Sequence, residues 1–261
     1  MIGIFDSGVG GLTAVKAFDT LFPDCDIVYF GDTARIPYGT KSRDVINRYA
    51  LQDCRFLLTK NVDSILVACG TVSSNSLSLL KETFDLPIEG VVEAASRKAY
   101  ETAVAGNGKI AILGTSATVK SGAFEKAILS HGTDVTITSR ACPLFVPLVE
   151  NGRFRRGDAL STIAAKEYLE DIIPEKPASL ILGCTHYPLL APVLSELLPE
   201  TKLISSSEEA ARSLCAGGIK GGSGNRSFFV SDDPEGFASL GKSFLGESIE
   251  NKVAQINIEE Y

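Results

Sequence analysis

The chain has 261 residues, of which 44% are hydrophobic and 22% charged, an ordinary composition for a globular protein with room for two modest domains. Its formal net charge of −7 comes without a basic run that could neutralise phosphates, so we expect no nucleic-acid partner. The sequence contains neither a signal-peptide pattern nor an apolar run of about 18 residues, so we expect no membrane segment and a cytoplasmic location.

Apolar, strand-like runs alternate with helix-length segments along the whole chain. The predicted strands are 2–5, 26–30, 64–68, 88–92, 109–113, 134–138, 179–182, 201–204 and 227–230. The predicted helices are 11–20, 41–59, 73–84, 93–104, 121–131, 145–151, 157–171, 189–198, 207–215 and 234–244. This alternation predicts an α/β fold with mainly parallel strands and helices on both faces. The Gly- and Ser-rich segment 217–225 predicts a flexible loop.

The order of these elements contains a coarse duplication. The first half opens with a strand that ends in Asp6-Ser7, and the second opens with a strand that ends in Gly114-Thr115-Ser116. We therefore predict two pseudo-symmetric lobes, each a mainly parallel sheet flanked by helices, with the active site in the cleft between them. The predicted limits are 1–92 plus 208–261 for the first lobe and 93–207 for the second.

Two apolar strands, one in each half, end at a cysteine that a hydroxyl residue soon follows. Cys69 precedes Gly70-Thr71, and Cys184 precedes Thr185. Ligands of open α/β sheets bind beyond the carboxyl ends of the strands. A helix that begins at this point favours the thiolate form of a cysteine. The sequence therefore predicts two thiols that act on one substrate from two sides.

The other cysteines do not form a recognisable metal or disulfide pattern. They are Cys25, Cys54, Cys142 and Cys215. We interpret them as reduced, buried apolar residues. The chain has no Cys-x-x-Cys motif and only two histidines, so we predict no metal site.

A glycine-rich segment follows the first strand. Gly8 and Gly10 fit the start of a dinucleotide-binding fingerprint, but Thr13 stands where the third glycine is needed. The acidic Asp6 would also repel a pyrophosphate. We therefore predict a small anionic ligand that faces Asp6 and Ser7, and no nucleotide cofactor.

Two further segments can be interpreted in more than one way. The segment 31–39 is a rigid turn with Tyr38 near its apex, in which Asp32 would be a helix cap and Arg35 a surface charge. Glu150 ends an apolar run and is usually a solvated residue. It gains a function only if it lies beside His186, whose tautomer it could then hold.

Taken together, these motifs resemble the glutamate racemases of the cofactor-independent aspartate/glutamate racemase family. The matching segments are 5–11, 31–39, Cys69-x-Thr71, Gly114-Thr115-x-Ala117-Thr118 and 183–188, in the family's order. The resemblance implies an isomerase with two pseudo-symmetric lobes, no cofactor and a small-molecule substrate. It also implies a homodimer, and supply of D-glutamate for peptidoglycan.

The resemblance and the residues together suggest a two-base mechanism. Cys69 would act on D-glutamate with help from Asp6, and Cys184 on L-glutamate with help from His186 and Glu150. Donors around the cleft would hold the two carboxylates of the substrate. The predicted substrate-binding residues are Asp6, Ser7, Pro37, Tyr38, Gly39, Gly70, Thr71, Thr115, Thr118, Thr185 and His186.

One position departs from the family pattern. The family usually has Asn between the first cysteine and its threonine, whereas this chain has Gly70. The missing amide removes a hydrogen bond to the α-amino or α-carboxylate group, so aspartate or another acidic amino acid stays an alternative substrate. Two other functions also remain open: a cysteine hydrolase with His186 as its base, and a non-catalytic amino-acid-binding protein.

Overall fold

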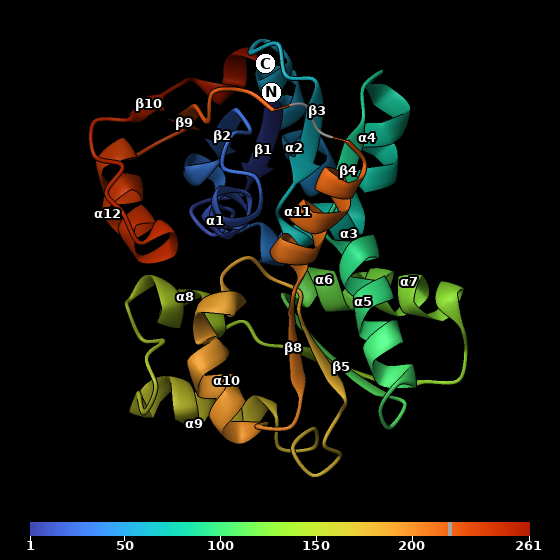
Figure 1. The fold of residues 1–261 in the computed structure, drawn as a ribbon. Helices are drawn as coiled ribbons and strands as arrows, with labels where there is room; N and C mark the ends of the chain where they lie inside the picture. The colour runs from blue at the N-terminus through green and yellow to red at the C-terminus, as the bar shows by residue number, and fades with distance from the viewer. Residues whose placement is uncertain (219–220) are drawn as a thin grey trace.

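The computed structural model describes residues 1–218 and 221–261, so residues 219 and 220 of the predicted Gly/Ser loop lie outside the described residues. Two parallel sheets, each flanked by helices, confirm the predicted α/β class (Figure 1). The strands of the first sheet, in spatial order, are β10 (Val253–Gln255), β9 (Arg226–Val230), β2 (Ile27–Gly31), β1 (Ile2–Asp6), β3 (Ser64–Val67) and β4 (Ile88–Gly90). Those of the second are β6 (Thr136–Ala141), β5 (Lys109–Gly114), β7 (Ser179–Leu182) and β8 (Lys202–Ser205).

Helices connect the strands and cover both faces of each sheet, as parallel pairing requires. They are α1 (Leu12–Leu21), α2 (Arg43–Leu58), α3 (Gly70–Asn75), α4 (Leu77–Thr83), α5 (Val92–Val104), α6 (Ser116–Ser121), α7 (Ala123–His131), α8 (Phe145–Glu150), α9 (Ala159–Tyr168), α10 (Ala191–Leu197), α11 (Ser206–Ala216) and α12 (Pro234–Leu245). We call the first sheet with its helices the first lobe, and the second sheet with its helices the second lobe. Among the described residues, no helix is long and apolar enough to cross a bilayer.

The central strands are fully buried because helices cover both of their faces. Every residue of β1, β2 and β7 is buried, which explains their continuous apolar sequences. Strand β6 lies at a sheet edge, is only half-buried and has a mixed sequence. One apolar core extends through both lobes, since it contains Ile4 of β1 and Leu180 of β7.

Some predicted boundaries are wrong, for identifiable reasons. The helix predicted at 73–84 begins at Gly70 and is divided at Ser76, so Cys69 occupies its N-cap position. Helix α6 and strand β10 were not predicted, because both are short and lack apolar periodicity.

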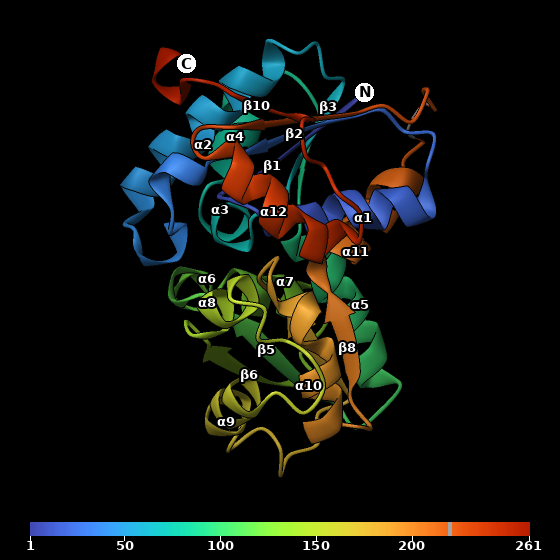
Figure 2. The same cartoon turned by 90° about the vertical axis from the view of Figure 1, so that its left-hand side faces the viewer.

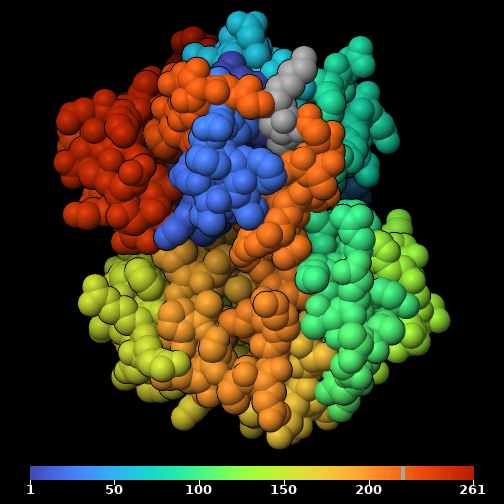
Figure 3. Space-filling model, viewed as in Figure 1, coloured from blue at the N-terminus to red at the C-terminus, as the bar shows by residue number. Residues whose placement is uncertain are grey.

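The chain crosses between the lobes twice, through α5 and α11, which pack against each other. Two perpendicular views place α11 at the junction (Figures 1 and 2). In the first lobe α1 packs against both α11 and α12, and the space-filling view shows it between them (Figure 3). The exact lobe limits at 92/93 and 207/208 stay a prediction.

Candidate active site

The carboxyl ends of the central strands of both sheets meet at the junction of the lobes. On the first lobe, β1 ends at Asp6 and β3 leads through Ala68 to Cys69. On the second lobe, β5 leads to Thr115, which caps α6, and β7 leads to Cys184. Side chains from distant parts of the chain therefore gather at one place, as parallel sheets dictate.

The thiol of Cys69 is buried beside a hydroxyl and a carboxyl group. Cys69 is 4% exposed, and its Sγ lies 3.7 Å from Ser7 Oγ. Burial and, less strongly, the charge of Asp6 raise the pKa of Cys69 to about 12, against weaker contacts with Val72 and Ser7. The expectation that the helix N-terminus would make this thiol a thiolate is wrong, because desolvation outweighs the helix.

The thiol of Cys184 has a different helper. Its residue is 7% exposed, and Sγ lies 3.9 Å from Nδ1 of His186. The other ring nitrogen, Nε2, lies 2.9 Å from Oε1 of Glu150. Burial lowers the pKa of His186, but the contacts with Cys184 and Glu150 outweigh it and raise the pKa to about 10. The raised pKa favours the imidazolium form of His186, which places a positive charge beside Cys184.

Asp6 lies between the two halves of the site. Its Oδ1 accepts a hydrogen bond from the Gly8 amide at 3.1 Å, and its Oδ2 accepts one from the Thr185 hydroxyl at 3.3 Å. Burial raises the pKa of Asp6, while the charge of His186 and these donors lower it. The carboxyl group predicted to assist Cys69 thus also contacts the residue that follows Cys184.

The predicted hydroxyl donors of the second lobe form a short chain that reaches the first lobe. Thr115 Oγ1 lies 3.0 Å from Thr71 Oγ1 and 2.9 Å from Thr118 Oγ1. Gly39 packs on the same threonine, because a methyl group on Gly39 would lie 2.9 Å from Thr115 Cβ. The structure therefore brings these four predicted substrate-binding residues together.

Tyr38 and Pro37 are placed differently from the other predicted residues. Pro37 is exposed and precedes the 3₁₀ turn Tyr38–Thr40. The Tyr38 hydroxyl donates to Asp32 and lies 3.3 Å from Asp53 Oδ2, so it is held inside the first lobe. A donor to the substrate from this segment would come from its backbone.

The interpretation of Arg35 as a surface charge and of Asp32 as a helix cap is wrong. The Arg35 side chain is 8% exposed and lies 2.6 Å from Asp32 and 3.1 Å from Asp53. Its guanidinium also stacks on the Tyr49 ring at 4.1 Å. Asp32 makes no side-chain cap bond. Asp53 was missed, although an acidic residue among the buried positions of α2 was a signal for a buried ion pair.

Known proteins with this sequence pattern and fold are racemases. A family model described as Asp/Glu/Hydantoin racemase matches residues 13–214. The chain belongs to this family. It is 42% identical to a glutamate racemase of Geobacter metallireducens, over 99% of this chain and 97% of that protein. It is 43% identical to the glutamate racemase of Persephonella marina, over 95% and 94% of the two chains.

Solved racemase structures have the same fold. The glutamate racemase of Francisella tularensis in complex with D-glutamate superimposes with a TM-score of 0.90 at 33% identity, over 100% of this chain and 98% of that one. The glutamate racemase of Thermus thermophilus in complex with beta-chloro-D-alanine gives a TM-score of 0.87 at 42% identity, with the same coverage. The family resemblance found in the sequence is therefore confirmed.

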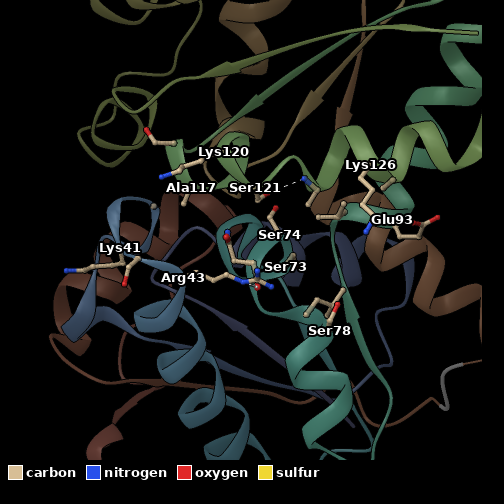
Figure 4. Close-up of a pocket in the computed structure, with 18 of the residues that line it drawn as sticks. Lys41, Arg43, Ser73, Ser74, Ser78, Glu93, Ala117, Lys120, Ser121 and Lys126 are labelled. Atoms are coloured by element: carbon tan, nitrogen blue, oxygen red, sulfur yellow. Dashed lines mark hydrogen bonds between the residues drawn. The ribbon is translucent and has the colours of Figure 1, made fainter. Parts of the chain in front are cut away.

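A cavity of about 970 Å³ lies between residues of the two lobes, and neither thiol lines it. Figure 4 shows first-lobe residues such as Arg43 and Ser74 on one side and second-lobe residues such as Lys120 and Ser121 on the other. Gly39, which packs on Thr115, lines its edge. The two thiols are thus buried away from this cavity.

Proposed function

We propose that this protein is a glutamate racemase that interconverts L- and D-glutamate through a two-base cysteine mechanism without a cofactor. The observation that carries the proposal is the meeting of two buried thiols, Cys69 and Cys184, at facing sheet edges of two lobes. The identity to glutamate racemases over nearly the whole chain supports the choice of substrate.

The chemistry inverts one carbon by two proton transfers on opposite faces. Starting from L-glutamate, the Cys184 sulfur takes the Cα proton, and the Cys69 thiol gives its proton to the other face. The reverse reaction exchanges these roles, so each turnover removes one proton and returns one. The electrostatics suit these roles, because the raised pKa of Cys69 keeps a proton on that thiol and the imidazolium form of His186 places a positive charge beside Cys184.

The polar groups around the thiols would stabilise the charge that develops on the substrate. The hydroxyl groups of Thr71, Thr115 and Thr118 and the backbone near Gly39 are candidates to bind the carboxylates. Fixed donors in a site closed to water stabilise a carbanion better than water does. Asp6 and the His186–Glu150 pair would then assist proton transfer on their own faces.

The test of this mechanism is the pair of variants Cys69→Ala and Cys184→Ala. Each should lower racemisation by at least about 10²-fold, measured by circular dichroism on L- and D-glutamate and by Cα–H exchange in D₂O. Cys215→Ala, which changes a cysteine of α11 outside the site, is the matched control and should keep its activity. Near-wild-type racemisation by either single variant would contradict the two-base assignment. An acyl-enzyme detected by mass spectrometry of the intact protein would indicate a hydrolase instead.

We further infer a homodimer that works in the cytoplasm and supplies D-glutamate for peptidoglycan. Sedimentation of the purified protein tests the dimer. Depletion of the protein in growing cells tests the pathway, since added D-glutamate should restore growth. The same assay with L- and D-aspartate tests the alternative substrate that Gly70 leaves open.

A further inference from the structure

The lobes touch at a backbone contact one residue away from each thiol. A methyl group on Gly70 would lie 2.2 Å from the carbonyl oxygen of Gly183, far inside van der Waals contact. Gly70 directly follows Cys69, and Gly183 directly precedes Cys184. From this geometry we infer that Gly70 is a positioning residue that sets the separation of the two thiols. The inference deepens the proposed function and rests on it.

Gly70 cannot be displaced easily within the first lobe. It is the first residue of α3, whose first turn is closed by a bond from the Ser73 amide to the Cys69 carbonyl at 2.9 Å. The Ser73 hydroxyl donates to the Val67 carbonyl of β3 at 2.8 Å and accepts from the Val91 amide at 3.1 Å. The position of residue 70 is therefore fixed relative to its own sheet.

Gly183 is equally fixed within the second lobe. Its amide donates to the Leu113 carbonyl of β5 at 2.8 Å, and a methyl group on Gly183 would lie 2.7 Å from that same carbonyl. A side chain at residue 70 therefore meets the backbone of a residue that packs tightly on its own sheet. The remaining way to relieve the collision is to move the two lobes apart.

The neighbouring glycines of the interface differ in this respect. A methyl group on Gly10 would meet the side chains of Thr185 and His186, and one on Gly39 would meet the side chain of Thr115. Side chains can change rotamer, whereas the Gly183 carbonyl moves only with the backbone that carries it. Among these three positions, Gly70 is the one at which any side chain acts directly on the spacing of the lobes.

The expected consequence is a loss of catalytic rate in both directions. Bringing a methyl group from 2.2 Å to ordinary contact separates the backbones of residues 70 and 183 by about 1 Å. A misplacement of about 1 Å costs about 10²-fold in rate when two groups must reach one atom. Gly70→Ala should therefore lower kcat by about that factor with L- and with D-glutamate. Gly70→Asn should do the same, although it adds the amide that the family usually has.

The experiment measures three properties of Gly70→Ala, Gly70→Asn and a matched control. The control is Gly221→Ala, because a methyl group on Gly221 has no neighbour within 4 Å. The properties are kcat and KM for both enantiomers, the thermal unfolding midpoint, and the rates at which iodoacetamide labels Cys69 and Cys184, resolved by peptide mass spectrometry. Both Gly70 variants should lose kcat, label faster at both thiols and unfold at a lower midpoint, because the apolar core shared by the lobes is loosened, while the control stays like wild type.

Three results would overturn the inference. The first is a Gly70→Ala or Gly70→Asn variant with wild-type kcat, because a side chain would then fit without moving the lobes. The second is a loss of kcat without faster labelling of the thiols. The third is faster labelling of one thiol alone, which would place the change inside one lobe. If the wild-type protein does not racemise glutamate, the proposed function fails, and the labelling and unfolding data still test the contact.

Discussion

Glu150 Oε1 lies 2.9 Å from Nε2 of His186, and the other ring nitrogen of that imidazole, Nδ1, lies 3.9 Å from Sγ of Cys184. The contact joins α8 to the loop after β7, two segments that are far apart in the sequence. In the mechanism proposed above, Glu150 is a positioning residue that acts on Cys184 through His186.

The first prediction concerns the charge of Glu150. In Glu150→Gln the pKa of His186 should fall from about 10, because one of the groups that raise it loses its charge. If racemisation of L-glutamate depends on the imidazolium form of His186, the variant should lose activity at a lower pH than wild type as the pH is raised. The measurement is kcat/KM against pH from 6 to about 10.

The matched control for this variant is Glu93→Gln. Glu93 Oε1 lies 3.1 Å from Nε2 of the other histidine, His131, which ends α7. Its pH profile should match that of wild type. Identical profiles for Glu150→Gln and wild type would show that Glu150 does not set the charge of His186.

The second prediction is the pH dependence of stability that follows from the same pair. The pKa of His186 is about 10 in the folded protein against an ordinary value of 6.5, so the folded state binds the proton more tightly. The stabilisation is fully present below pH 6.5 and is lost as the pH rises toward 10. The difference in unfolding free energy between wild type and Glu150→Gln should therefore be largest near pH 6 and shrink toward pH 10, as urea titrations can measure. A constant difference would argue against the linkage.

The third prediction concerns the buried ion pairs of Arg35. Arg35→Ala leaves Asp32 and Asp53 without their cation and should cost about 3–5 kcal/mol of unfolding free energy. Arg55→Ala, which removes an exposed arginine of α2, should cost far less. Equal unfolding midpoints for the two variants would show that Arg35 stabilises the protein no more than a surface charge does.

The fourth prediction is that the Tyr38 hydroxyl stabilises the first lobe and does not bind the substrate. Tyr38→Phe removes a donor to the carboxylates of Asp32 and Asp53 and should cost about 1.5–3 kcal/mol of stability. Because the hydroxyl is bound inside the first lobe, KM for glutamate should change little. A large rise in KM with unchanged stability would show that the hydroxyl turns toward the substrate.

The fifth prediction concerns Asp6 and Cys69. Burial is the main cause of the raised pKa of Cys69, and the Asp6 charge adds to it. Asp6→Asn should lower that pKa, so iodoacetamide should label Cys69 faster at pH 7 while racemisation falls. Asp24→Asn, at an exposed carboxyl group of the same lobe, should change neither rate. Slower labelling in Asp6→Asn would contradict the electrostatic contact.

The α/β class, the parallel pairing and the sheet edge that carries the candidate site could be predicted from the amino-acid sequence. Continuous apolar strands such as 65–67 and 180–182 indicate parallel strands in the middle of a sheet, because only strands covered on both faces are apolar throughout. The ordered motifs around Cys69 and Cys184 also identified the family, which the comparisons confirm.

Which groups face each other, and how strongly each is desolvated, is known only from the three-dimensional packing. Sequence patterns carry no information on the distance between Gly70 and Gly183, or on the burial that keeps a proton on Cys69. Local sequence sets backbone direction and periodicity, whereas contacts between segments more than 100 residues apart, and the dielectric environment they create, arise only when the two lobes pack together.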